Sequence, residues 1–247
     1  MVQLVGIVNI TPDSFSDGGK YSEPADAIAR VEQLFSDGAS IVDVGAESTR
    51  PNATPLTDDE EWRRLEPILR VIIPKHPNKL SIDTYHHETA RRALAIGPVI
   101  INDVTGFSHP RMIDVVLKYK PTVIISHLPG NDIQQAHQQA PTSTVVEVKR
   151  ALLATATDLL QRGFPKENII LDPGIGFGKT MELNHTLLKF GSEIADYPVM
   201  IGYSRKRFLG EDRMEIEPNR KAGQIAASHG ATYLRVHDIA GHKNLLG

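Results

Sequence analysis

The chain has 247 residues, of which 40% are hydrophobic and 23% are charged, and its formal net charge is −3. This balance favours a globular protein with a substantial core, and it offers no basic field for nucleic acid. Cysteine is absent and no stretch approaches the roughly 18 apolar residues of a membrane span, so we expect a cytoplasmic protein without disulfides or a membrane partner.

Eight short runs rich in β-branched residues recur along the chain. In order they cover 4–8, 40–44, 79–82, 98–101, 121–125, 168–171, 198–201 and 232–236. They are apolar on both faces, which is typical of buried parallel strands. The segments between them are amphipathic and predict helices. One of these, 57–72, begins with the capping-box pair Thr57 and Glu60.

Eight strands that alternate with helices in about 250 residues predict a TIM (β/α)8 barrel, an α/β fold, as a single domain over 1–247. A doubly wound open sheet is the alternative, although such a sheet seldom needs eight units. We see no linker or low-complexity tract that would divide the chain.

Each predicted strand ends in a polar or charged residue. The set comprises Asn9, Asp43, Glu47, Asp83, Asn102, Asp103, His127, Asp172, Ser204, Arg205, Lys206, Arg235 and His237. Barrel enzymes place their chemistry at these carboxyl ends, so the pattern indicates an active site. The structural alternative is that some of them, such as Asp43 and Asp103, only bond backbone N–H groups in turns.

The residue types divide into two groups. Asp83, Asn102 and Asp172 suit a ligand with a donor-rich, guanidine-like edge, because a carboxylate forms paired charge-assisted bonds with such an edge. The cationic group comprises Arg50, Lys206, Arg235 and His237, on separate loops, and it predicts an anion site. For Asp172 a turn cap ahead of Pro173 is the alternative reading.

The motif "DPGIGFGKT" at 172–180 resembles a phosphate-binding loop. The glycine that such a loop needs five residues before Gly-Lys-Thr is replaced by Pro173, which has no N–H for a phosphate. We therefore expect phosphate to bind elsewhere. Another loop, 9–19, carries Phe15 among Gly, Ser and Asp residues, and such a residue suits a lid that excludes water. The histidines are scattered and do not have zinc spacing, whereas Mg²⁺ needs few protein ligands.

Seven motifs in order, from residue 6 to 238, resemble the dihydropteroate synthase family: "GIVNITPDSFSDGG", "GAESTRP", "SIDT", "IIND", "DPGIGFGKT", "SRKRF" and "RVHD". The resemblance implies a (β/α)8 barrel and a transferase of folate biosynthesis. The implied reaction joins (7,8-dihydropterin-6-yl)methyl diphosphate to 4-aminobenzoate, giving 7,8-dihydropteroate and diphosphate. The C–O bond would ionise first, and the amine would then attack.

The resemblance also implies roles for individual residues and partners. The pterin would be held by Asp83, Asn102, Val104, Asp172, Lys206 and Arg235. The diphosphate and aminobenzoate would be held by Phe15, Thr49, Arg50, Pro51, Phe177, Ser204 and His237. Mg²⁺ would be ligated by Asn9, and the catalytic set would be Asp17, Arg50, Lys206 and His237. A homodimer and sensitivity to sulfonamides are further implications.

Two other functions stay open from the sequence. One is a methyltransferase that binds a pterin and acts with a corrinoid protein, but this reaction has no need of the motifs "STRP" and "SRK". The other is a catalytically silent paralogue that only binds pterin. Its support is Ser126, at a position where the family usually has Met beneath the pterin.

Overall fold

The computed structural model describes residues 2–10, 24–48, 53–131, 133–136, 142 and 144–245. Eight parallel strands form one sheet in the order β6-β5-β4-β3-β2-β1-β8-β7. Their bounds are β1 Gln3–Asn9, β2 Ile41–Gly45, β3 Leu80–Asp83, β4 Ile100–Asp103, β5 Val123–Ser126, β6 Ile169–Asp172, β7 Met200–Gly202 and β8 Tyr233–Val236. All eight overlap the strands predicted from the sequence.

The two outer strands of this order, β6 and β7, come together through a parallel bridge between Leu171 and Val199. The N–H of Leu171 also donates to the carbonyl of Pro198 at 3.0 Å. The sheet therefore curves round to meet itself, and the predicted (β/α)8 barrel is confirmed.

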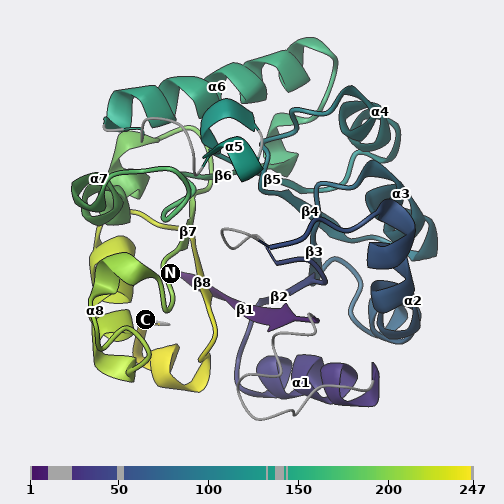
Figure 1. Cartoon of the computed structure of the whole chain (residues 1–247), viewed down its shortest axis with the longest axis horizontal. Helices are drawn as coiled ribbons and strands as arrows, with labels where there is room; N and C mark the ends of the chain where they lie inside the picture. Colours follow the sequence, from purple (N-terminus) through teal and green to yellow (C-terminus); the bar gives the residue numbers. More distant parts are fainter. Residues whose placement is uncertain are drawn as a thin grey trace.

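Helices surround the strands on the outside of the barrel (Figure 1). Their bounds are α1 Pro24–Ser36, α2 Asp58–Lys75, α3 His87–Ile96, α4 Pro110–Tyr119, α5 Ile133–Ala136, α6 Val145–Gln161, α7 Met181–Thr186 and α8 Ile216–Ser228. Short 3-10 segments cover η2 Pro129–Asn131, η3 Lys166–Asn168, η4 Leu187–Glu193, η5 Arg207–Leu209 and η6 Ala240–Leu245. Among the residues described, no helix combines the length and apolar character needed to cross a membrane.

The predicted capping box at the start of α2 is confirmed. The hydroxyl of Thr57 accepts from the N–H of Glu60 at 3.3 Å, and the Glu60 carboxylate accepts from the N–H of Thr57 at 2.9 Å. These bonds satisfy N–H groups that a helix start leaves without partners. The same arrangement of Thr144 and Glu147 begins α6.

The core has two parts. The larger part lies between the sheet and the helices and includes Leu34, Leu65, Ile72 and Leu152. The smaller part consists of residues contributed by six strands, namely Val5, Ile41, Ile100, Ile124, Ile170 and Met200, with Tyr233 of β8 packed against it. Because side chains alternate across a strand, this second set is on the face opposite the helices and fills the barrel interior.

Candidate functional site

The alternation of the strands places a polar layer directly above the apolar filling of the barrel. Residues two positions further along a strand share its face, one layer closer to the carboxyl end. The residues that follow the apolar layer in this way are Asp43, Asn102, Ser126, Asp172, Gly202 and Arg235, together with the apolar Ile7 after Val5. Asn9 and Asp83 continue the same face at the ends of β1 and β3, where they align with Gly45.

Four strands are joined by one charged network in this layer. Arg235 of β8 donates from Nε to Asp43 of β2 and from Nη2 to Asp83 of β3, both at 2.6 Å. Asn102 of β4 donates to the same Asp43 oxygen at 3.1 Å. The planar guanidinium of arginine suits this bridging of two carboxylates. Asp83 and Asn102 therefore lie in one network with Arg235, a member of the cationic group.

Asp172, at the end of β6, lies close enough to Lys206 for each charge to affect the pKa of the other. The Asp172 carboxylate accepts from the N–H of Gly174 at 2.7 Å. Lys206 donates from Nζ to the carbonyl of Ile175, and its Nζ lies 4.9 Å from the centroid of the Phe177 ring. Thus the cap interpretation of Asp172 is correct for one oxygen, and the residue still belongs to the polar layer.

Ser204 and His237, from the loops after β7 and β8, form a second pair. The ring Nδ1 of His237 lies 3.0 Å from Oγ of Ser204, and the His237 N–H donates to the same hydroxyl at 3.3 Å. Arg30 of α1 donates to the carbonyl of His237 at 2.9 Å. The two loops expected to face an anion are therefore in contact with each other.

Burial shifts the pKa values of the titratable side chains in and beside the polar layer. It raises the pKa of Asp83, against the opposing effect of Arg235, and the pKa of Asp172, against Lys206. Burial lowers the pKa of Lys206 to about 8, while Asp172 opposes the change. A ligand that donates hydrogen bonds to Asp83 and Asp172 would favour their charged forms.

Two members of the cationic group differ in character. Burial alone would lower the pKa of Arg235, but Asp43 and Asp83 outweigh it and raise the pKa. For His237, burial and the charge of Arg205 lower the pKa to about 3. At neutral pH His237 is therefore a neutral hydrogen-bonding group, and not the cation that the sequence grouping suggested.

The remaining predicted residues fall into two classes. Asn9 is exposed at the end of β1, and Val104 is buried directly after β4. Phe15, Asp17, Thr49, Arg50 and Pro51 lie outside the described residues.

Sequence reasoning missed Asp43 as a site residue. Of the two aspartates considered as turn caps, Asp103 is one, since it accepts from the N–H groups of Thr105 and Phe107. Asp43 instead accepts from Asn102 and Arg235. The signal that distinguishes them is position: Asp43 is two residues after the inward-facing Ile41, whereas Asp103 is three residues after Ile100.

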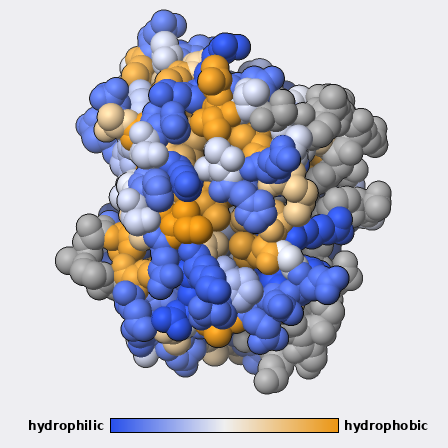
Figure 2. Space-filling view, turned by 90° about the vertical axis from the view of Figure 1, so that its left-hand side faces the viewer, coloured by the Kyte–Doolittle hydropathy of each residue, from blue (hydrophilic) through white to orange (hydrophobic). Residues whose placement is uncertain are grey.

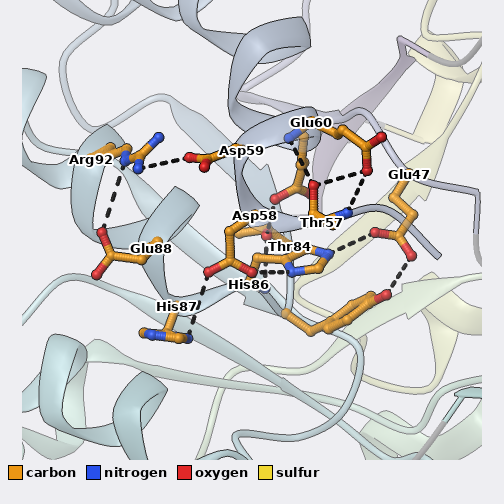
Figure 3. Close-up of polar contacts among 12 residues, drawn as sticks. Glu47, Thr57, Asp58, Asp59, Glu60, Thr84, His86, His87, Glu88 and Arg92 are labelled. Carbon is orange, nitrogen blue, oxygen red and sulfur yellow. Dashed lines mark hydrogen bonds and ion pairs between the residues drawn. The ribbon is translucent and has the colours of Figure 1, made fainter.

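A second polar network lies where β2 and β3 lead into their helices (Figure 3). The ring of His86 lies between two carboxylates, with Nε2 2.7 Å from Glu47 and Nδ1 2.8 Å from Asp58. Tyr85 donates its hydroxyl hydrogen to the other oxygen of Glu47. Thr84 donates to the buried Glu61 at 2.7 Å.

Glu47, Glu61 and His86 each offer one atom that could ligate a metal, all within 4.8 Å of one another. The sequence spacing gave no sign of this cluster because its members come from different elements. Although burial acts in the opposite direction, the bonds to Glu47 and Asp58 raise the pKa of His86 to about 9. The ring is therefore protonated at neutral pH, and a proton competes with any metal there.

Known proteins resemble this chain over almost its whole length. Residues 5–237 match the family model for pterin binding enzymes. A dihydropteroate synthase of Escherichia coli K12 is 35% identical over 246 residues, which cover 96% of this chain and 86% of that protein. One from Neisseria meningitidis serogroup C is 37% identical, covering 96% and 88%.

Solved structures give the same result. The Xanthomonas albilineans dihydropteroate synthase with 4-aminobenzoic acid has a TM-score of 0.86 at 37% identity, covering 99% of this chain and 90% of that chain. The Yersinia pestis enzyme with a sulfonamide drug complex has a TM-score of 0.90 at 29% identity, covering 99% and 92%.

Proposed function

The chain belongs to the pterin-binding enzyme family, and on that premise we propose that it catalyses the dihydropteroate synthase reaction. The substrates are (7,8-dihydropterin-6-yl)methyl diphosphate and 4-aminobenzoate, and the products are 7,8-dihydropteroate and diphosphate. The observation that carries the proposal is the polar layer, in which Asp83, Asn102 and Asp172 share one barrel mouth with Arg235 and Lys206.

Recognition of the pterin follows from the acidic part of this layer. The amino group and ring N–H of a pterin form a guanidine-like edge, which donates in parallel to a carboxylate. One oxygen of Asp172 accepts from the Gly174 N–H and still has a second lone pair, so both oxygens can accept from this edge. Asn102 supplies an amide oxygen, since its nitrogen donates to Asp43. Arg235, held flat by two carboxylates, suits stacking on the pterin face.

The reaction exchanges one bond for another at the methylene carbon. The C–O bond to diphosphate breaks and its electron pair leaves with the diphosphate, while the pterin ring delocalises the cation on the methylene. The aromatic amine nitrogen then forms the new C–N bond and loses a proton to solvent. A weakly basic amine needs no strong general base, and exclusion of water by Phe15 and Asp17 in the first loop would protect the cation.

Groups that stabilise the leaving charge lie on the later loops. Ser204 and the neutral imidazole of His237 offer hydrogen-bond donors, and Lys206 offers a charge near the Phe177 ring. Thr49, Arg50 and Pro51 complete this proposed subsite. Phe177 and Lys206 would frame the aminobenzoate from the side of β6 and β7.

We assign Mg²⁺ to Asn9. Its carboxamide is exposed at the carboxyl end of β1, on the inward face of the strand. One such oxygen fits the ion, because Mg²⁺ keeps several waters and takes most other ligands from substrate phosphates. When bound, Mg²⁺ supplies positive charge to the leaving diphosphate.

The assembly and location are also proposals. We infer one catalytic domain over 1–247, a homodimer and a cytoplasmic location. The side of the molecule formed by α7 and α8 carries apolar patches among hydrophilic ones (Figure 2). Ile216 and Ile225 of α8 are exposed, and so is the nearby Met214, so this face suits self-association.

A turnover assay tests the function. The purified chain is given dihydropterin diphosphate, 4-aminobenzoate and Mg²⁺, and dihydropteroate and diphosphate are measured. We expect both products in equal amounts, with loss of activity in EDTA that Mg²⁺ restores. Pterin binding without product would favour the silent paralogue. Methyl transfer from methyltetrahydrofolate to a corrinoid protein would favour the methyltransferase.

A further inference from the structure

Lys179, in the motif "DPGIGFGKT", has no role in the site described above. Its Nζ donates to three backbone carbonyls, those of Gly174 at 2.7 Å, Phe177 at 3.0 Å and His127 at 3.1 Å. A lysine ammonium has three N–H donors, so this set uses all of them. The lysine that makes the motif look like a phosphate-binding loop is therefore fully committed to carbonyl oxygens of the protein itself.

The three carbonyls belong to two neighbouring loops. Gly174 and Phe177 lie in the loop after β6, and His127 follows β5 directly. The loops also touch through their backbones, since the His127 N–H donates to the carbonyl of Asp172 at 3.0 Å. Gly174 has a φ of 64°, and a Cβ there would clash with the His127 carbonyl oxygen. This close approach brings several carbonyl dipoles together, and the ammonium of Lys179 neutralises them.

The loop that Lys179 contacts also positions Asp172 and Lys206, two residues that are proposed to bind the pterin. The Gly174 N–H donates to the Asp172 carboxylate at 2.7 Å. The next carbonyl, that of Ile175, accepts from Lys206, whose Nζ lies against the Phe177 ring. A shift of this short loop would therefore displace the partners of Asp172 and Lys206 together.

We propose that Lys179 is a positioning residue for pterin binding, which cross-links the loops after β5 and β6 and thereby fixes the Asp172 carboxylate and the Lys206 ammonium. The proposal rests on the function proposed above. Burial lowers the pKa of Lys179 to about 7, while the charge of Asp172 opposes this. Below this pH the charged form predominates, and its three donors are then all directed at the three carbonyls.

The first test uses Lys179→Met, which keeps the length of the side chain and removes its charge and donors. We expect the Kd for a dihydropterin without diphosphate to rise about tenfold or more, since one charge-assisted hydrogen bond is worth about 1.4 kcal/mol or more, a factor of ten. The KM for the pterin substrate should rise similarly, and kcat should fall as well, since Lys206 is displaced together with Asp172. Amide hydrogen exchange should accelerate in 174–178.

The matched control is Ile72→Ala, near the C-terminal end of α2 in the core between the sheet and the helices. It lowers stability without touching the loop, so we expect an unchanged pterin Kd at a similar loss of Tm. An equal loss of affinity in the control, or an unchanged Kd in folded Lys179→Met, would overturn the proposal. If the wild-type chain itself binds no pterin, the proposed function is overturned, which is a distinct result.

Chemical rescue provides a second test. Lys179→Ala lacks a fragment equivalent to n-propylammonium, which has the three donors in the same place. Adding n-propylammonium should restore pterin affinity in this variant, whereas tetramethylammonium, which has no N–H, should not. Equal restoration by the two ions, or no restoration by n-propylammonium, would contradict a hydrogen-bonding role for Lys179.

Discussion

The contacts of His86 allow a pH-dependent contribution to the free energy of unfolding to be predicted. Its ring lies between Glu47 and Asp58, and its own side chain is 9% exposed. Burial lowers the pKa of His86, but the bonds to these carboxylates and the charge of Glu61 outweigh it and raise the pKa from 6.5 to about 9. At about 1.4 kcal/mol per pKa unit this amounts to about 3 kcal/mol of stability. Because the Asp58 side chain is 34% exposed, solvent screening reduces the expected value to about 2 kcal/mol.

The sign follows from the direction of the change. The pKa is higher in the folded protein, so the stabilisation is complete below pH 6.5 and disappears as the pH rises through about 9. We therefore expect His86→Gln to be less stable than the wild type by about 2 kcal/mol at pH 6 beyond any pH-independent cost. At pH 10 this extra difference should vanish.

Urea unfolding of both proteins at pH 6, 8 and 10 measures this difference. Glu61 lies next to the same network, and burial raises its pKa to about 7, so its own titration must be compared in both proteins. The control is His185→Gln, at an exposed position on α7. A stability difference that stays constant from pH 6 to 10 would refute the idea of a charged His86.

Three further predictions concern the site. Asp172→Asn should raise the Kd for pterin at least tenfold in a fluorescence titration, because the carboxylate is lost while the bond to Gly174 remains possible. An unchanged Kd would exclude Asp172 as a pterin ligand. The value of kcat/KM should fall above about pH 8 as Lys206 loses its proton, and this fall should move to higher pH in Lys206→Arg. A wild-type profile that is flat to pH 9.5 would contradict a role for charged Lys206. Arg50→Ala should reduce turnover in a steady-state assay and leave binding of diphosphate-free pterin largely intact, and loss of that binding would show that the two subsites are not separate.

Much of the fold was predictable because the signals are local. The β-branched runs give the eight strands, and the pair Thr57 and Glu60 gives the start of α2. The strand ends then identify the side chains at the barrel mouth, since the carboxyl ends of parallel strands meet at one edge. Asp83, Asn102, Asp172 and Arg235 were found by this rule.

Other features depend on contacts between distant residues and were not predictable. The pairing of Asp43 with Arg235 joins residues 192 positions apart. The low pKa of His237 results from burial and from neighbouring cations, which no sequence pattern shows. Likewise the motif around Lys179 suggests a phosphate ligand, whereas in the structure its ammonium donates to three backbone carbonyls.

The central claim is that Asp83, Asn102 and Asp172 open onto the same cavity as the cationic groups, and that this cavity holds the pterin. A crystal structure of the chain with 7,8-dihydropteroate tests it most directly. We predict the pterin edge within hydrogen-bond distance of Asp172 and Asn102, with its ring against Arg235 and its aminobenzoate part beside Phe177 and Lys206. A ligand bound away from the carboxyl ends of the strands, with Asp172 and Arg235 untouched, would contradict the account.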